Sequence, residues 1–347
     1  MRYGLGAENP AESALLAAGL VPRAMFDGYA PIYARAVVLA TELGMFDAIG
    51  AAGAPAGAVA DSCRTDPRAT EKVLNLLVAM RYLSRKGANY RLAAHTRRFL
   101  LADAPGSIRD VILMKRLEWR WIDGLDEFVR SGAPLNVHES MSPDDWDAYQ
   151  RGMRAQASPM ASLVARFVPV PKGARDMLDV GGSHGYFSVA ICRRHPGLRS
   201  TVLDLPMAVA HAAPLLAREQ MGDRVALRAG DALTDDLGDG AYDLIFMFSL
   251  VHHFDEASNR ELVARCATAL RPGGILAIGD IMRPTGPARG GQQVAFFDLY
   301  FALTSEAGLW TVDEVRAWQS AAGLRPRRPA RLPFSGGLVI QSATRPR

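Results

Sequence analysis

The sequence predicts an α/β protein whose mostly parallel sheet is preceded by a helical domain. Its length of 347 residues suggests about two domains. In the second half of the chain, short apolar strands alternate with helical segments, which indicates βαβ units and a parallel sheet. The hydrophobic fraction of 49% and the charged fraction of 22% are ordinary for a folded protein, which excludes a disordered or collagen-like chain.

The first half of the chain is expected to contain helices and one hairpin. Apolar residues recur at helical spacing over residues 34–43, and Asp66-Pro67 supplies an N-cap followed by a proline at the first helical position. Residues 82–85 and 90–92 flank a Lys-Gly-Ala-Asn turn and predict a short β-hairpin. Because helix, helix and hairpin is the order of elements in a winged-helix domain, the sequence predicts such a domain here.

A Val-Pro-Lys-Gly segment at residues 170–173 marks the expected boundary between the two halves. We therefore expect residues 1–170 to form the winged-helix-like domain with its linker helices, and residues 171–347 to form a second, ligand-binding domain. The predicted strands of the second domain are Met177–Val180, Thr201–Leu203, Val225–Leu227, Leu244–Phe248 and Ile275–Ile278, and its predicted helices cover 185–195, 206–219 and 257–271.

A glycine-rich turn follows the first of these strands, where Gly181, Gly182 and Gly185 precede a helix. Glycine is expected there because the polar part of a ligand would lie directly on the backbone, where a Cβ atom would collide with it. The N–H groups at the start of the helix can bind a carboxylate or a phosphate. The turn therefore predicts a ligand site at the carboxyl edge of the sheet.

Two acids follow the next two strands. Asp204 ends the second strand, where an acid can accept from both hydroxyls of a ribose, and Asp231, beside Ala232, follows the third strand, where it can accept from an adenine amino group. The dinucleotide pattern G-x-G-x-x-G is not met, because Ser183 and Tyr186 occupy its second and third glycine positions. The residues favour a ligand with adenosine and a short charged tail instead of a pyrophosphate, and S-adenosylmethionine is such a ligand.

Five segments together resemble the class I S-adenosylmethionine-dependent methyltransferases, and more narrowly the plant-type and bacterial small-molecule O-methyltransferases. They are Leu178–Gly185, Asp204-Leu205-Pro206, Gly230-Asp231, Leu250-Val251-His252 and Leu270–Gly274. The resemblance implies a Rossmann-like sheet of seven strands, an N-terminal dimerisation domain, and a homodimer that methylates a small aromatic or polycyclic secondary metabolite. The turn and the resemblance together assign the cofactor contacts to Gly181, Gly182, Gly185, Asp204, Asp231 and Ala232.

The resemblance places a catalytic base at His252, because the family has a histidine just after the fourth strand, in a Leu-His-Asp-Trp type segment. Removing a phenol proton calls for a base whose pKa lies near the working pH, as that of an imidazole does. Asp280, at the end of the fifth strand, takes the place of the first carboxylate that assists the base in plant members. The second carboxylate is replaced by Leu309 or Trp310, and His253 stands where an aspartate is usual.

This incomplete set of acids leaves alternatives open. Proximity and alignment can accelerate methyl transfer without a base, so carbon or nitrogen methylation of a similar small molecule is the alternative to O-methylation. The two adjacent histidines could be only structural, or could bind a metal with Asp280 or Asp298, although no metal-binding spacing recurs and we expect no metal. The aromatic segment 296–301 could wall a flat acceptor or belong to the core.

The net charge of +4 and the isoelectric point near 9.1 raise the question of a nucleic-acid partner. Six basic residues and no acid lie between residues 81 and 98, so a winged-helix DNA-binding regulator is the alternative from a different functional class. Such a regulator would not need the glycine turn, Asp204 and Asp231. We therefore expect no nucleic acid as a partner.

The sequence also bears on location. It contains no run of about 18 uncharged apolar residues, and its N-terminus lacks a basic region followed by an apolar run. The three cysteines, Cys63, Cys192 and Cys266, have no metal or redox spacing and are expected to be buried thiols. We therefore expect a cytoplasmic S-adenosylmethionine-dependent methyltransferase that acts on a hydroxyl of a small molecule and has no membrane partner.

Overall fold

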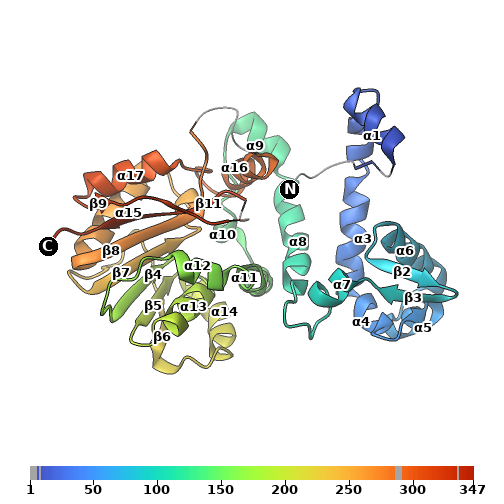
Figure 1. The fold of residues 1–347 in the computed structure, drawn as a ribbon, viewed down its shortest axis with the longest axis horizontal. Coiled ribbons are helices and arrows are strands. Elements are labelled where there is room, and N and C mark those ends of the chain that lie inside the picture. The colour runs from blue at the N-terminus through green and yellow to red at the C-terminus, as the bar shows by residue number, and fades with distance from the viewer. Residues whose placement is uncertain (1–5, 8, 286–290, 334–335) are drawn as a thin grey trace. The chain divides into compact units, whose positions relative to one another are not determined.

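The computed structural model describes residues 6–7, 9–285, 291–333 and 336–347 (Figure 1). Contacts within the chain divide it into two compact units, and the division lies between Arg116 and Leu117. The predicted division of roles near residue 170 stays a prediction. The compact units divide earlier in the chain because the helices between residues 117 and 167 cluster with the sheet of the second unit.

The N-terminal unit contains helices and a small antiparallel sheet of order β1-β3-β2. The predicted helices and hairpin are present: Asp66 caps α6 by accepting from the backbone N of Ala69 at 2.7 Å, and β2 pairs with β3. Phe46, Leu74 and Tyr90 are buried in its core, and the winged-helix assignment stays a prediction. The elements are α1 (Pro10–Ala17), α2 (Arg23–Asp27), α3 (Ala30–Glu42), α4 (Met45–Ile49), β1 (Ala54–Pro55), α5 (Ala56–Cys63), α6 (Pro67–Ala79), β2 (Leu83–Lys86), β3 (Asn89–Leu92) and α7 (Ala94–Phe99).

The second unit is built on a sheet whose strand order is β10-β11-β8-β7-β4-β5-β6, with β9 also pairing with β11. Neighbours from β6 to β8 are parallel, and β11 is antiparallel to β8. All five predicted strands are confirmed; the described sheet has eight strands, where seven were expected, because two-residue segments pair along β11. The strands are β4 (Asp176–Val180), β5 (Arg199–Asp204), β6 (Val225–Ala229), β7 (Tyr242–Phe248), β8 (Leu270–Ile281), β9 (Arg325–Pro326), β10 (Ala330–Arg331) and β11 (Leu338–Thr344).

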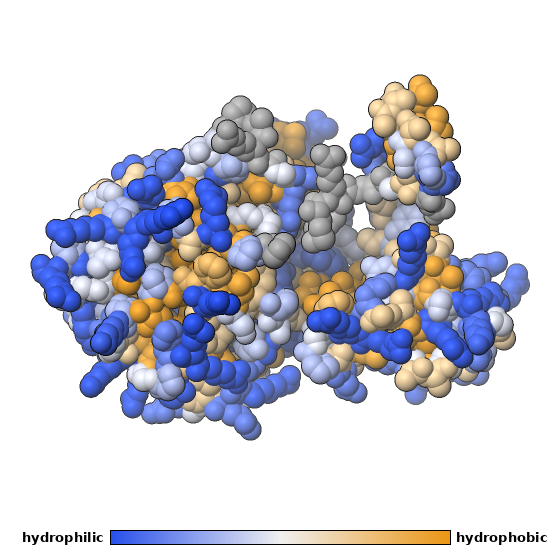
Figure 2. Space-filling model, in the orientation of Figure 1, coloured by the Kyte–Doolittle hydropathy of each residue, from blue (hydrophilic) through white to orange (hydrophobic). Residues whose placement is uncertain are grey.

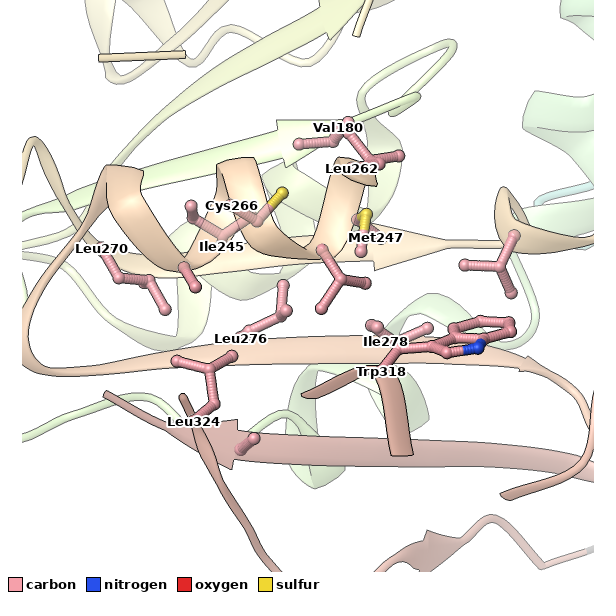
Figure 3. Close-up of a cluster of buried hydrophobic side chains, with 14 of the residues drawn as sticks. Val180, Ile245, Met247, Leu262, Cys266, Leu270, Leu276, Ile278, Trp318 and Leu324 are labelled. Carbon is pink, nitrogen blue, oxygen red and sulfur yellow. The ribbon is translucent and has the colours of Figure 1, made fainter. Parts of the chain in front are cut away.

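Helices cover both faces of this sheet (Figure 1). Alternate residues of β7 point to opposite faces, so that Ile245 and Met247 join one apolar cluster while Leu244 and Phe246 join the other. The first cluster includes Trp318, which is buried against β8 (Figure 3). Burial on both faces explains the nearly continuous apolar runs of these strands. The first face is covered by α15 (Glu256–Ala269) and α17 (Val312–Ala321), and the second by α12 (Ala161–Phe167), α13 (Tyr186–Arg194) and α14 (Pro206–Ala217).

The remaining helices lead to the site. Ser142 and Asp145 form a capping box at the start of α11, in which each side chain accepts from the other residue's backbone N at 3.2 Å. In the part of the chain that the structure describes, no helix is long and apolar enough to cross a membrane. Cys192 and Cys266 are buried as expected, whereas Cys63 is half-buried. The remaining helices, which lead to the site, are α8 (Arg109–Ile122), α9 (Leu125–Ser131), α10 (Val137–Ser140), α11 (Pro143–Ala157) and α16 (Gln292–Thr304).

Candidate functional site

A pocket of about 640 Å³ lies at the carboxyl ends of β4 to β7. This volume is within the range of small-molecule sites, and the carboxyl edge of an open α/β sheet is where such sites form. On the side of the sheet, the pocket is lined by Gly181, Gly182, Asp204, Asp231, Ala232 and Leu250. On the helical side, it is lined by His138, Trp146, Tyr149, Gln150, Met153 and Phe297. Five of the six predicted cofactor residues therefore lie in this one pocket.

The glycines between β4 and α13 are required by packing inside the protein. Gly181 has a φ of +66°, and a Cβ atom there would lie 2.5 Å from Cδ1 of Leu250. A Cβ atom on Gly182 would lie 2.6 Å from Cγ of Asp179. Contacts inside the protein are therefore enough to require glycine at these two positions, and the expected contact of a ligand with this backbone stays a prediction. Gly185, the sixth predicted cofactor residue, is the N-cap of α13 with a φ of +69° and does not line the pocket.

Asp179 is a buried acid beneath this turn. Ser188 Oγ donates to its Oδ2 at 2.5 Å and lies 2.8 Å from Ser200 Oγ. Loss of water around the carboxylate raises the pKa of Asp179 to about 7, although the hydrogen bond from Ser188 opposes this shift. The pKa of Asp179 therefore lies well above that of a free carboxyl group, beneath the backbone that shapes the site.

The two acids after β5 and β6 both line the pocket. Asp204 Oδ2 accepts from the backbone N of Ser183 at 2.6 Å, and its Oδ1 accepts from that of Leu205 at 2.8 Å. Desolvation raises the pKa of Asp204 to about 6 in spite of these two bonds. Asp231 Oδ1 accepts from the backbone N of Leu233 at 2.8 Å. Both carboxylates are thus fixed by backbone N–H groups at the edge of the same pocket.

His252 and Asp280 form a buried pair. His252 Nδ1 lies 2.9 Å from Oδ2 and 3.1 Å from Oδ1 of Asp280. The ring of Phe301 stacks on the imidazole of His252 with a centroid distance of 3.6 Å and an angle of 12° between the planes. The structure brings the predicted base and its assistant together, but His252 is only 3% exposed and is not one of the residues that line the pocket.

His253 is the imidazole that lines the pocket. Its Nδ1 lies 2.7 Å from Ser305 Oγ, and its ring centroid lies 4.2 Å from that of His252 and 4.9 Å from that of His138. Burial and the two neighbouring imidazoles hold the pKa of His253 well below its usual range, and burial lowers the pKa of His138 to about 4. Both rings are therefore neutral near pH 7 and can exchange hydrogen bonds with an uncharged ligand.

The position of the second carboxylate is apolar, as expected. Leu309 is buried, and Trp310 Nε1 donates to the backbone O of Val251 at 2.9 Å. The aromatic segment of α16 has mixed roles. Phe297 lines the pocket and Phe301 stacks on His252, whereas Phe296 and Leu299 are exposed. Neither of the two predicted readings of this segment, pocket wall or core, describes it completely.

The helical wall is what sequence reasoning missed. Trp146, Tyr149, Gln150 and Met153 recur on one side of α11 and line the pocket. Their spacing of three and four residues indicates an amphipathic helix, but it does not reveal what that face packs against. Only the folded chain brings α11 to the turn after β4.

The alternative of a metal site depends on whether the candidate ligands converge on one point. Among the described residues, no three His, Cys, Asp or Glu side chains are placed to hold a metal ion. His252 faces Asp280, whereas His253 faces Ser305. The two histidines therefore have different partners although they are adjacent in the sequence.

The sequence of the chain is similar to those of known proteins. Residues 129–325 match the family described as the O-methyltransferase domain. The chain belongs to this family. The methyltransferase is 27% identical over 320 residues to the 3-hydroxy-5-methyl-1-naphthoate 3-O-methyltransferase of Streptomyces sahachiroi, covering 88% of this chain and 90% of that relative. It is 30% identical over 271 residues to the 3-amino-4-hydroxybenzoate 4-O-methyltransferase of Streptomyces cremeus, covering 73% and 72% respectively.

The fold of the methyltransferase also has counterparts among solved structures. An O-methyltransferase family protein from Burkholderia thailandensis matches it with a TM-score of 0.81 and 23% identity, over 98% of this chain and 99% of that one. The match of residues 129–325 confirms the predicted family, and the structural match confirms the α/β fold.

The buried carboxyl of Asp179 predicts a pH-dependent stability. Its pKa is about 7 in the folded methyltransferase and about 3.9 in an unfolded chain, so the folded state binds the proton more tightly. The contribution of Asp179 to stability is therefore largest below pH 4 and is lost as the pH rises to 7. Asp179→Asn should flatten the fall in urea midpoint between pH 4.5 and 7.5. Asp126→Asn, at an exposed position of α9, is the control, and an equally steep fall in Asp179→Asn would contradict this account.

Proposed function

We propose that the methyltransferase transfers the methyl group of S-adenosylmethionine to a hydroxyl of a small aromatic or polycyclic secondary metabolite. Membership of the O-methyltransferase family supports this reaction, and both relatives described above are named for hydroxylated aromatic acids. The observation that carries the proposal is the content of one pocket, in which Asp204 and Asp231 face the same space as His253 and the aromatic side chains of α11.

The residues at the strand ends fit the cofactor. Asp204 presents its carboxylate where ribose hydroxyls can donate to it, and Asp231 can accept from an adenine amino group. With the turn at 181–183, these two acids would hold S-adenosylmethionine. When bound, this cofactor supplies an electrophilic methyl group on a positively charged sulfur.

We propose His252 as the base. An ionised carboxylate can only accept hydrogen bonds, so Asp280 keeps the proton on Nδ1 of His252 and leaves Nε2 to take the proton of the acceptor hydroxyl. The stacked ring of Phe301 limits the access of water to the imidazole. His253, which lines the pocket and whose ring centroid lies 4.2 Å from that of His252, would orient the acceptor.

Binding of S-adenosylhomocysteine tests the cofactor site. Ribose hydroxyls donate more strongly to a carboxylate than to an amide, so Asp204→Asn should weaken binding by about 10- to 100-fold. Wild-type affinity should fall as the pH drops through about 6, where Asp204 becomes protonated, and the variant should lack this dependence. Calorimetry measures both effects, with exposed Asp239→Asn as the control; a wild-type protein that binds no S-adenosylhomocysteine would overturn the proposed function.

The roles of the two imidazoles can be separated by kinetics. His252→Ala should lower kcat by about 10²–10⁴-fold, the usual contribution of a general base, because the variant lacks the imidazole that takes the proton. His253→Asn should mainly raise KM for the acceptor. Steady-state rates on the best acceptor of a hydroxylated aromatic panel would measure this, and the reverse order of effects would assign the base to His253.

We further propose that the N-terminal part of the chain mediates a homodimer. Large apolar side chains on and between α1, α2 and α3 are exposed, among them Leu20 at 71% and Ile32 at 62%. Figure 2 shows apolar side chains gathered over α1. Exposed apolar surface of this kind is typical of a protein–protein interface, and a second copy of the same chain is the proposed occupant.

Light scattering tests the dimer. Leu20→Asp combined with Ile32→Asp places two charges on the apolar surface, and should shift the mass from twice 37.5 kDa to 37.5 kDa. Val129→Asp is the matched control, because Val129 is 72% exposed on α9 in the other unit. A wild-type mass of 37.5 kDa at all concentrations would contradict the proposal.

We propose no nucleic-acid partner for the basic hairpin. Arg85 Nη2 lies 3.6 Å from Glu71 Oε1, and its guanidinium carbon lies 5.2 Å from the ring centroid of Tyr90. The middle of the basic stretch is thus engaged within its own unit.

The cytoplasmic location stays a prediction.

A further inference from the structure

Two side chains of the glycine turn contact the same helix. Ser183 Oγ donates to Gln150 Oε1 at 2.8 Å, and the guanidinium carbon of Arg154 lies 3.4 Å from the ring centroid of Tyr186. Gln150 and Arg154 are four residues apart on α11, so they lie on the same side of that helix. The two residues that depart from a glycine pattern therefore both contact α11.

The contact through Ser183 is partly buried and connects to the predicted cofactor site. Ser183 has a φ of +51°, a conformation that costs a residue other than glycine free energy. Its backbone N donates to Asp204, and its hydroxyl donates to Gln150, which is 1% exposed. A continuous path of two hydrogen bonds thus runs from the Asp204 carboxylate to α11.

The contact through Tyr186 is reinforced from a neighbouring helix. Arg154, which stacks on Tyr186, also forms an ion pair with Glu219, just after α14. Glu219 Oε2 lies 3.1 Å from Nη2 of Arg193 on α13. Stacking and charge together hold α11 against the helix that begins at the turn.

The helix held in this way carries a large part of the pocket wall. Trp146 and Tyr149 precede Gln150 on α11, and Met153 precedes Arg154. A shift of α11 would displace all three side chains at once, because they share one rigid helix. We call these three side chains the acceptor wall, and their position depends on the turn after β4.

We propose that Ser183 and Tyr186, through Gln150 and Arg154, form a clamp that couples cofactor binding to the position of the acceptor wall. Gln150 and Arg154 are positioning residues in this scheme. The proposal rests on the proposed function, since it takes Asp204 as the acceptor of the ribose hydroxyls. A ligand that fixes Asp204 fixes Ser183, then Gln150, and so orders α11.

Such coupling is reciprocal. If the cofactor stabilises the position of α11, then an acceptor bound against α11 strengthens cofactor binding by the same factor, typically about 5- to 150-fold. A plain glycine at position 183 would hold the same backbone but would lack the link to α11.

Hydrogen–deuterium exchange of the full chain tests the clamp without knowledge of the acceptor. Saturating S-adenosylhomocysteine should slow exchange of the amides of residues 143–157 by at least about fivefold in the wild type. In Gln150→Ala and in Ser183→Gly, the ligand should still bind but should no longer slow exchange in α11. Ser183→Gly guards against misfolding, because glycine adopts the positive φ of this position without strain.

Conservative variants separate the clamp from a general loss of structure. Tyr186→Phe keeps the ring under Arg154 and should retain the protection of α11, whereas Tyr186→Leu should lose most of it. Asp147→Asn is the control on the same helix, because the ion pair of Asp147 with Arg151 lies within α11, and it should behave like the wild type.

The outcomes are distinct. Binding of S-adenosylhomocysteine without any change in α11, or full protection in both Gln150→Ala and Ser183→Gly, would overturn the clamp and leave the proposed function intact. No binding by the wild type would overturn the proposed function and the clamp with it.

Discussion

The close packing of the backbone after β4 is the constraint on which the site depends. A side chain at Gly181 would overlap Leu250, and one at Gly182 would overlap Asp179. Because these contacts are made by protein atoms, the turn has its shape before any ligand binds. It thereby fixes the backbone N–H of Ser183 against Asp204, and it sets where α13 begins. The ends of β4, β5 and β7 meet around this one turn.

The pocket disfavours charge of either sign. Desolvation raises the pKa of Asp204 to about 6, lowers that of His138 to about 4, and holds that of His253 well below its usual range. The imidazoles are consequently neutral at pH 7, so the carboxylates have no positive partner there among the described lining residues. A positively charged ligand would supply the missing charge, which agrees with a sulfonium cofactor.

Sequence reasoning succeeded where the signal is local. The strand-helix alternation predicts five strands that the structure confirms, because burial on both faces makes each parallel strand a recognisable apolar run. The residues at strand ends, such as Asp204 and Asp231, follow from the same pattern, since the carboxyl ends of parallel strands share one edge. His252 and Asp280 could be paired because His252 follows β7 and Asp280 lies at the end of the neighbouring strand, β8.

The parts that escaped prediction depend on contacts between distant segments. The face of α11 that carries Gln150 is amphipathic in sequence, but its partner Ser183 lies 33 residues away. His252 and His253 are adjacent in the sequence. No periodicity predicts that the ring of His253 lines the pocket while that of His252 faces Asp280. The packing of Leu250, which follows β7, against Gly181 also could not be predicted, because the two residues are far apart in the sequence.

The position of β11 has a consequence for how the protein is made. This strand pairs with β8 along seven residues, from Leu338 to Thr344, yet it is the last strand in the described chain. Until these residues leave the ribosome, β8 presents a long apolar edge with unpaired backbone groups, and such edges promote association with other chains. The nascent enzyme therefore passes through a stage in which its sheet is nearly assembled but open on one side. During synthesis, the time spent in that stage sets the exposure of the chain to aggregation and its need for chaperones.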